Sequence, residues 1–239
     1  MTAQERRSVG SLALLYCFRM LGLFMVLPLL ALYAADLPGS TPALIGLALG
    51  MYGLTQALLQ IPLGWLSDQI GRKPVIIAGL LLFALGSVIA AMSDSIGGII
   101  LGRTLQGAGA IASTVMALVA DLTREEQRTK AMAAVGMSIG LSFAVALVLG
   151  PVVASFGGLP LVFWFTTALA FIGIAIVLLL VPSPPPVGSS VHSETGTRLG
   201  LISRVLGNAV LLRLDFGVFV LHFILTASFL VLPGLLEQS

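Results

Sequence analysis

The chain has 239 residues, of which 58% are hydrophobic and only 9% are charged, and its mean hydropathy is +1.09. A soluble domain of this length needs a polar shell with many more charged residues, so this composition excludes a water-soluble fold and indicates an all-α, polytopic membrane protein. The formal charge of +2 comes from single or paired bases between apolar runs, which excludes nucleic acid as a partner, and the single Cys17 excludes an internal disulfide and offers no metal cluster.

Seven apolar runs are long enough to cross a bilayer as helices. A bilayer core about 30 Å thick needs about 20 mostly apolar residues for each crossing. The runs span residues 11–34, 42–66, 74–92, 96–120, 131–155, 160–181 and 212–236. They are continuous stretches rich in Leu, Ala and Gly without the alternation of a barrel strand, so helices are predicted.

The Lys and Arg residues outside these runs fall into one of the two sets of connecting segments. Bases precede the first run, follow the second and the fourth, and lie between the sixth and the seventh. They are Arg6, Arg7, Arg72, Lys73, Arg124, Arg128, Lys130, Arg198 and Arg204, with Arg213 at the very start of the seventh run. Because cytoplasmic loops carry the excess of Lys and Arg, this asymmetry predicts that the N-terminus lies in the cytoplasm.

Arg19 lies inside the first run, roughly 12 Å from its cytoplasmic end at helical rise. A charge inside the bilayer is costly and therefore faces a cavity or a partner. Gln56 and Gln60 reach a similar depth in the second run and lie one turn apart on one helix face. We predict that these three side chains line one polar path, with Tyr33, Tyr52 and Ser142 as weaker candidates. Snorkelling of Arg19 to the inner surface is the alternative.

Scarce charge is concentrated after the second run, where Asp68, Gly71, Arg72 and Lys73 follow Gly64. Exposed carbonyls make the potential negative at the C-terminal end of a helix, so Asp68 needs a positive partner. Candidates are Arg72 or Lys73 across the Gly71 turn, a base from the next cytoplasmic loop, and the N-terminus of another helix. Composition alone favours a simpler interpretation, a positive-inside anchor with a helix-ending turn.

Arg103 is the second base inside an apolar run, near the outer end of the fourth. An interfacial anchor is one interpretation of its position. The adjoining Gln106 and the glycines beside it, Gly107 and Gly109, favour a buried position with a hydrogen-bond partner. We therefore include Arg103 and Gln106 among the candidate pathway residues.

The first and the seventh runs share a short similar sequence. FMVLP at 24–28 matches FLVLP at 229–233, which predicts an internal repeat, although two apolar strings also match by chance. The predicted parts are a six-helix bundle at 1–182, a cytoplasmic linker rich in Pro, Ser and Gly at 183–211, and the first helix of a second bundle at 212–239. The end of the linker, 199–212, forms either a short amphipathic helix or an early start of the seventh helix.

Two stretches resemble motifs of the major facilitator superfamily of secondary transporters. GWLSDQIGRK at 64–73 resembles its signature loop between the second and third helices, and RTLQGAG at 103–109 is similar to its fourth-helix motif. The similarity extends over essentially the whole chain and is to the drug/proton antiporter-like branch. It implies a bacterial inner-membrane transporter of twelve helices, of which this sequence holds the first half and the first helix of the second half.

The resemblance also implies roles for particular residues. Arg72 is expected to pair with Asp121 in an ionic latch that closes the cytoplasmic side, while Asp68 faces the eleventh helix of the family's fold. The latch residues are Gly64, Asp68, Gly71, Arg72, Lys73 and Asp121. Arg103 is associated with proton coupling, and the helix-packing positions are Gly107, Gly109, Gly150 and Pro151. Two departures weaken the antiporter assignment: Gln69 replaces a base, and Ala154 and Ser155 replace paired glycines after Gly150-Pro151.

The predicted function is proton-coupled efflux of small molecules by alternating access. The sequence has no nucleotide-binding loop and no catalytic or metal-ligand grouping, so neither an enzyme nor a cofactor is expected. A channel is disfavoured because polar residues in the runs are isolated. The remaining alternative is a non-transporting membrane subunit or fragment. The expected partners are a small-molecule substrate, protons, the lipid bilayer, and a missing C-terminal bundle or a second copy, without which the chain transports poorly.

Overall fold

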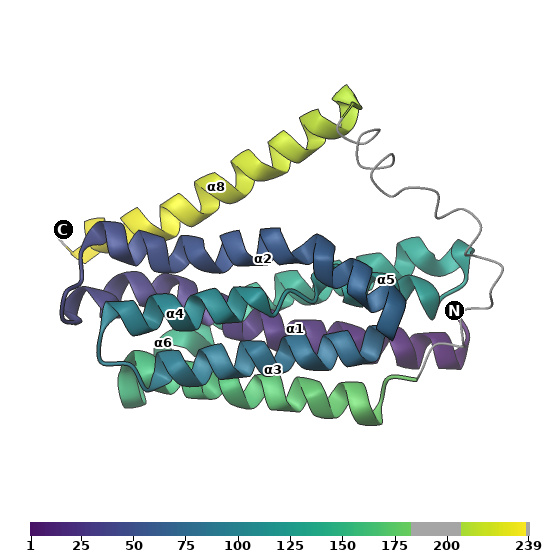
Figure 1. The fold of residues 1–239 in the computed structure, drawn as a ribbon, viewed down its shortest axis with the longest axis horizontal. Helices are drawn as coiled ribbons and strands as arrows, with labels where there is room; N and C mark the ends of the chain where they lie inside the picture. The colour runs from purple at the N-terminus through teal and green to yellow at the C-terminus, as the bar shows by residue number, and fades with distance from the viewer. Residues whose placement is uncertain (183–206, 238–239) are drawn as a thin grey trace. The chain divides into compact units, whose positions relative to one another are not determined.

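A computed structural model describes residues 1–182 and 207–237, and the chain divides into two compact units, Met1–Ser183 and Pro184–Ser239. The first unit contains α1 (Ala3–Tyr33), the 3-10 helix η1 (Ala34–Asp36), α2 (Pro42–Ile70), α3 (Arg72–Ala91), α4 (Ile96–Ala108), α5 (Ala112–Asp121) and α6 (Glu125–Leu179) (Figure 1). The described part of the second unit contains α8 (Ala209–Glu237). No strand occurs in the described residues, and five helices are long and apolar enough to cross a membrane, which confirms the all-α, polytopic class.

The first helix begins well before the apolar run that predicted it. Thr2 is its N-cap: Thr2 Oγ1 accepts a hydrogen bond from the Glu5 backbone N–H (3.2 Å), and the Thr2 N–H donates to Glu5 Oε2 (2.6 Å). This reciprocal capping box satisfies N–H groups that the first helical turn leaves without partners. The helix therefore includes the polar segment 3–10, which hydropathy alone does not detect.

The fifth and sixth apolar runs are joined in α6, whose 55 residues bend at Gly157 and Gly158. A straight helix of that length would be about 80 Å long, far more than a bilayer core needs, so α6 makes two crossings. Gly158 has φ of +64°, a left-handed conformation that favours glycine. Pro160 follows at the start of the second crossing, where its missing N–H costs no hydrogen bond.

The prediction of one continuous helix over 96–120 is wrong. The backbone leaves helical geometry after Ala108 and α5 begins at Ala112. The Gly109 N–H is shared between the carbonyls of Leu105 (3.2 Å) and Gln106 (3.3 Å), which tightens the last turn of α4. Hydropathy did not reveal this break because the residues on both sides of it are equally apolar, while the glycines that lower helix propensity there are hydropathically neutral.

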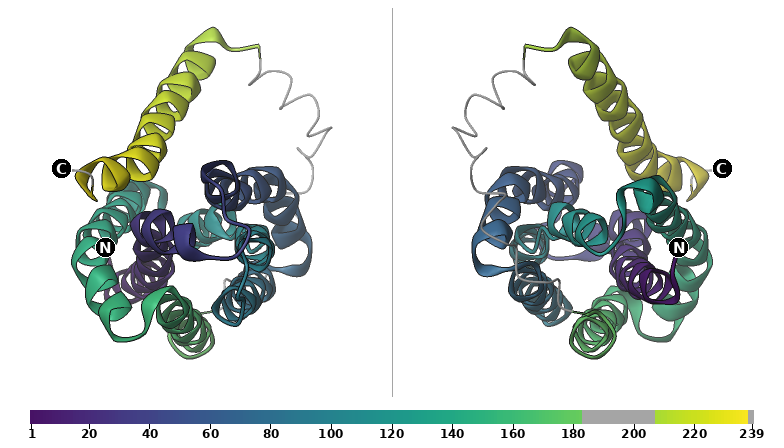
Figure 2. Two further views of the ribbon diagram at one scale, coloured as in Figure 1. Left: turned by 90° about the vertical axis from the view of Figure 1, so that its left-hand side faces the viewer. Right: turned by 90° about the vertical axis from the view of Figure 1, so that its right-hand side faces the viewer.

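The helices of the first unit run alongside one another in the end-on views (Figure 2). α1 packs chiefly against α6, and α4 packs against both α2 and α3. Backbones of α3 and α4 approach closely, because a Cβ on Gly86 would lie 2.5 Å from the Gly102 carbonyl oxygen and 2.6 Å from the Gln106 nitrogen. Such small-residue contacts hold helices together in lipid, where apolar side chains gain little from facing one another.

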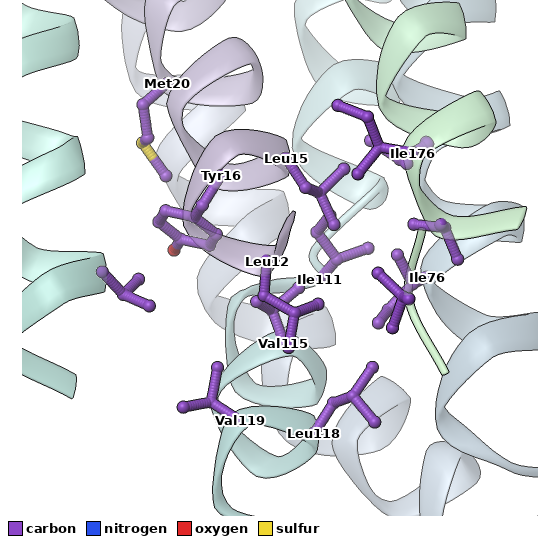
Figure 3. Packing of buried hydrophobic residues seen from close by; sticks show 14 of the residues in the cluster. Leu12, Leu15, Tyr16, Met20, Ile76, Ile111, Val115, Leu118, Val119 and Ile176 are labelled. Atoms are coloured by element: carbon purple, nitrogen blue, oxygen red, sulfur yellow. The ribbon is translucent and has the colours of Figure 1, made fainter. Parts of the chain in front are cut away.

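The apolar core joins the helices that carry the candidate site. Leu12 and Leu15 of α1, Ile76 of α3, and Ile111 and Val115 at the start of α5 are fully buried in one cluster (Figure 3). These contacts hold α5 beside α1 and α3.

In the second unit, α8 begins at Ala209, before the predicted start at 212. An amphipathic helix or an early start of the seventh helix was predicted for 199–212, and residues 199–206 of that segment lie outside the described residues. Large apolar side chains on α8, including Phe216, Phe219 and Phe223, are exposed within the second unit. An apolar helix with an exposed surface is consistent with contact with lipid.

Candidate functional site

One guanidinium joins three helix ends in the first unit. Arg72 Nη1 forms an ion pair with Asp68 Oδ1 and donates a hydrogen bond to Ser67 Oγ (2.7 Å), while Arg72 Nε lies 3.1 Å from Asp121 Oδ2. The Arg72 side chain is 17% exposed, against 31% for Asp68 and 38% for Asp121. Of the candidate partners for Asp68, the structure places Arg72 against it. Asp121 contacts the same guanidinium of Arg72.

The turn between α2 and α3 produces this geometry. Gly71 is both the C-cap of α2 and the N-cap of α3, and its φ of +100° is a conformation that side-chain-bearing residues rarely adopt. Because α3 starts directly after this residue, Arg72 points back to the last turn of α2. Lys73 is half-buried and makes no ion pair within 1–182 of the described chain.

Gly64 brings α2 and α5 together within this chain. A Cβ at Gly64 would lie 3.0 Å from Ser113 Oγ, and that hydroxyl donates a hydrogen bond to the Gln60 carbonyl (3.0 Å). The face of α2 that carries Gly64 therefore already contacts α5. The expected contact of Asp68 with a further helix of the family's fold stays a prediction.

A second polar group is fully buried between α2, α3 and α4. Arg103 Nη1 donates to Gln106 Oε1 (2.8 Å), and Gln106 Nε2 donates to Ser87 Oγ (2.7 Å), whose hydroxyl in turn donates to the Phe83 carbonyl (2.8 Å). The guanidinium carbon lies 4.5 Å from the centroid of the Tyr52 ring, a cation–π geometry. Arg103 is 0% exposed, so it has the buried, hydrogen-bonded position that its neighbours indicated, and it is not an interfacial anchor.

Arg19 is also buried, at 1% exposure, which excludes the snorkelling alternative. Its Nη2 donates to the Gly109 carbonyl (2.9 Å), and its guanidinium carbon lies 5.5 Å from the Phe83 ring centroid. Gln56 and Gln60 are half-buried, and each has a buried Oε1 without a hydrogen-bond partner in the described residues. The structure describes no hydrogen bond from Arg19 to either glutamine, so their common polar path stays a prediction.

The predicted packing glycines differ in how tightly they are held. A Cβ on Gly107 would collide with Thr55 Oγ1 and the Tyr52 carbonyl, and one on Gly109 would collide with the Gly79 carbonyl. Gly150 is less constrained, because its nearest neighbours would lie 3.5 Å away. Pro151 follows it inside α6 and is exposed.

A third ion pair in the described residues was not anticipated from the sequence. Glu5 Oε1 accepts hydrogen bonds from Arg124 Nε (2.9 Å) and from the Arg124 backbone N–H (3.2 Å), which joins the start of α1 to the start of α6. The hydrogen bond to Glu5 raises the pKa of the Arg124 guanidinium. The spacing of Thr2 and Glu5 is that of a capping box. It predicts that the Glu5 side chain turns back to the start of the helix, but it does not predict the contact with Arg124.

The sequence of this chain is similar to those of known membrane transporters. Residues 12–238 match the model of the family named Major Facilitator Superfamily. "Inner membrane transport protein YajR" of Escherichia coli is 54% identical over 242 residues, covering 100% of this chain and 52% of the relative. An "Uncharacterized transporter" of Buchnera aphidicola subsp. Schizaphis graminum is 40% identical, covering 96% of this chain and 58% of the relative. The chain thus spans about half the length of these curated relatives.

More distant matches extend the similarity. "Quinolone resistance protein NorA" of Staphylococcus aureus is 29% identical over 69% of this chain and 42% of its own length. Among solved structures, a bacterial homologue of the human lysosomal transporter Spinster has a TM-score of 0.68 at 17% identity, covering 82% of this chain and 48% of that one. The human organic anion transporter MFSD10 has a TM-score of 0.65 at 23% identity, covering 77% and 49%. At these identities the structures support the fold alone.

Proposed function

The chain belongs to the major facilitator superfamily, a family of membrane transporters rather than enzymes, and from this premise we propose that it forms one bundle of a proton-coupled exporter of small molecules. In this mechanism two bundles rock about a central site and expose it to one side of the membrane at a time. Transport then requires a closed state that is stable and yet easily opened.

The observation that carries the proposal is the position of Arg72 between Asp68 and Asp121. The three side chains come from the end of α2, the start of α3 and the end of α5, so movement of the α5 end away from the turn between α2 and α3 breaks the Arg72–Asp121 ion pair. Partly exposed ion pairs contribute only about 0.2 to 1 kcal/mol each. A contact of that strength suits a latch that forms and breaks in every cycle.

Arg103 supports coupling of transport to an ion. An ionisable group buried in a membrane-spanning region is costly and often marks the route of a substrate or proton. Its Nε and Nη2 have no hydrogen-bond partner in the described residues, so donors remain for an anionic group during the cycle. Proton coupling therefore requires a titrating group that approaches Arg103 in another state.

We place the protein in the bacterial inner membrane with its N-terminus in the cytoplasm. The bases near the latch, Arg72, Lys73 and Arg124, lie at the starts of α3 and α6, and the positive-inside rule expects such bases on the cytoplasmic side. An inner-membrane location also agrees with the name of the Escherichia coli relative.

Transport is proposed to require a second bundle, either a C-terminal half like that of the longer relatives or a second copy. On this basis the 239-residue chain by itself transports poorly. The alternative function is that of a non-transporting membrane subunit, and the two are separated by supplying the second half.

The test compares this chain with a fusion in which it replaces the corresponding half of the Escherichia coli relative. Both are expressed in everted vesicles, with a quinolone as the probe compound because one similar protein is named for quinolone resistance. We expect gradient-dependent quinolone uptake by the fusion, little uptake by the chain alone, and a reduction by Arg72→Gln but not by Arg6→Gln. Uptake that persists after a protonophore collapses the gradient would refute proton coupling, and robust uptake by the chain alone would refute the need for a second bundle.

A further inference from the structure

The break between α4 and α5 leaves backbone groups without helical partners in the middle of the fourth membrane run. Residues 109–111 interrupt the hydrogen-bond ladder, and no side chain caps the first turn of α5. Irregular backbone at membrane depth persists only where other protein groups satisfy it. The break therefore needs a partner from a neighbouring helix.

Arg19 of α1 supplies that partner. Its Nη2 donates to the Gly109 carbonyl at 2.9 Å, the single hydrogen bond described for this guanidinium. The ring of Phe83 lies under the charge, and Nε and Nη1 have no partner in the described part of the chain. Burying a guanidinium charge that forms one hydrogen bond costs free energy. We take this cost as a sign that holding the Gly109 carbonyl in place is the role of Arg19.

The two helices joined at the break carry different parts of the site. α4 holds the buried Arg103–Gln106 contact and packs closely on α3 through Gly102, whereas α5 ends at Asp121, the partner of Arg72. The break thus separates α4, which packs tightly on α3, from α5, which ends at the partly exposed ion pairs.

We propose that the segment 109–111 is a hinge about which α5 pivots to draw Asp121 away from Arg72, and that Arg19 is the positioning residue that holds the hinge closed through the Gly109 carbonyl. A hinge is a short segment that absorbs backbone rotation while the helices on both sides stay intact. The link to Arg72 rests on the latch in the proposed function, but the role of Arg19 at the break does not.

The first measurement is hydrogen exchange of the amides at 110–114 in the 239-residue chain in lipid nanodiscs. Arg19→Met removes the donor at similar length, Arg19→Gln keeps a neutral amide donor, and Arg6→Met is a control on the exposed start of α1. Because hydrogen bonds to charged groups are among the stronger ones, we expect exchange to rise roughly tenfold or more in Arg19→Met. Arg19→Gln is expected to stay closer to the parent, and Arg6→Met to match it.

The second measurement follows the latch directly. Spin labels at Gln69 and Glu125, in a background with Cys17→Ala, report the separation of the α2 end from the segment after α5. A narrow distance distribution is expected in the parent, with a broader, longer one in Arg19→Met. Unchanged distances would overturn the link between the hinge and the latch.

Exchange in Arg19→Met equal to the parent, or equal exchange in the Met and Gln variants, would overturn the role of the hydrogen bond. If Arg19→Met does not give a monodisperse protein, Arg19→Leu replaces it with the same expected rise in exchange, because leucine also lacks a donor, and exchange equal to the parent would overturn the role of the hydrogen bond. Neither measurement involves transport, so failure of the hinge and failure of the exporter are distinguishable.

Discussion

Arginine is used in two different ways in this bundle. At the helix ends, Arg72 is 17% exposed and lies between two carboxylates. Inside the bundle, Arg19 and Arg103 are almost completely buried, and their described hydrogen bonds go to a backbone carbonyl and a glutamine amide. The difference indicates that the exposed group serves a contact that is weak enough to break, whereas the buried groups are held by structure that opposes their movement.

The largest expected effect is at Arg103. Arg103→Ala removes a fully buried side chain and leaves Gln106 Oε1 without its donor, so we expect a loss of about 3 kcal/mol in the free energy of unfolding. Arg103→Met also removes the donor to Gln106, but it fills most of the volume and buries no charge, so a smaller loss of about 1 kcal/mol is expected. Urea unfolding in mild detergent, followed by tryptophan fluorescence, measures both. Equal losses in the two variants would contradict the role assigned to packing.

A smaller effect is expected at the glycines of the two regions. A Cβ at Gly107 meets the Tyr52 backbone carbonyl, which cannot rotate away, so Gly107→Ala is expected to cost about 2 kcal/mol. At Gly64 the nearest atom is the rotatable Ser113 hydroxyl at 3.0 Å, and a cost below about 1 kcal/mol is expected. The control is Gly53→Ala, because Gly53 has nothing within 4 Å of the added carbon. The same unfolding assay applies, and a larger loss for Gly64→Ala than for Gly107→Ala would reverse the comparison.

Hydropathy and spacing predict much of this architecture. Long apolar runs identify the crossings because every helix has to span the same bilayer thickness. The spacing of Asp68, Gly71 and Arg72 predicts an ion pair because it is a local relation across one turn. The acid at Asp121 was found only through the family resemblance, since nothing in the local sequence indicates that it meets Arg72.

The rest depends on tertiary packing. The break at 109–111 leaves no mark in hydropathy, and the Arg19 contact with the Gly109 carbonyl involves a backbone group that every residue has. Ser87 was missed for a related reason: a serine inside an apolar run is common, and only the position of Gln106 makes it a partner. Glu5 and Arg124 are 119 residues apart in sequence, so their ion pair could not be inferred from spacing.

The smallest effect is expected at the exposed ion pairs. A double-mutant cycle of Arg72→Gln and Asp121→Asn is expected to give a coupling of about 0.5 kcal/mol in the unfolding assay. Because both groups are partly exposed, about 1 M salt should reduce this coupling further. Arg72→Gln combined with Asp94→Asn, an exposed acid in the connection between α3 and α4, serves as the control and is expected to give no coupling.

The size of that coupling decides how the two regions differ. A value above about 2 kcal/mol would mean that Arg72 is held as firmly as a buried charge, and such a contact would slow the opening of the bundle instead of permitting it. A coupling near 0.5 kcal/mol alters an equilibrium constant only about twofold. The ion pair then biases the closed state without trapping it, and binding of a substrate or a proton has enough free energy to reverse the bias.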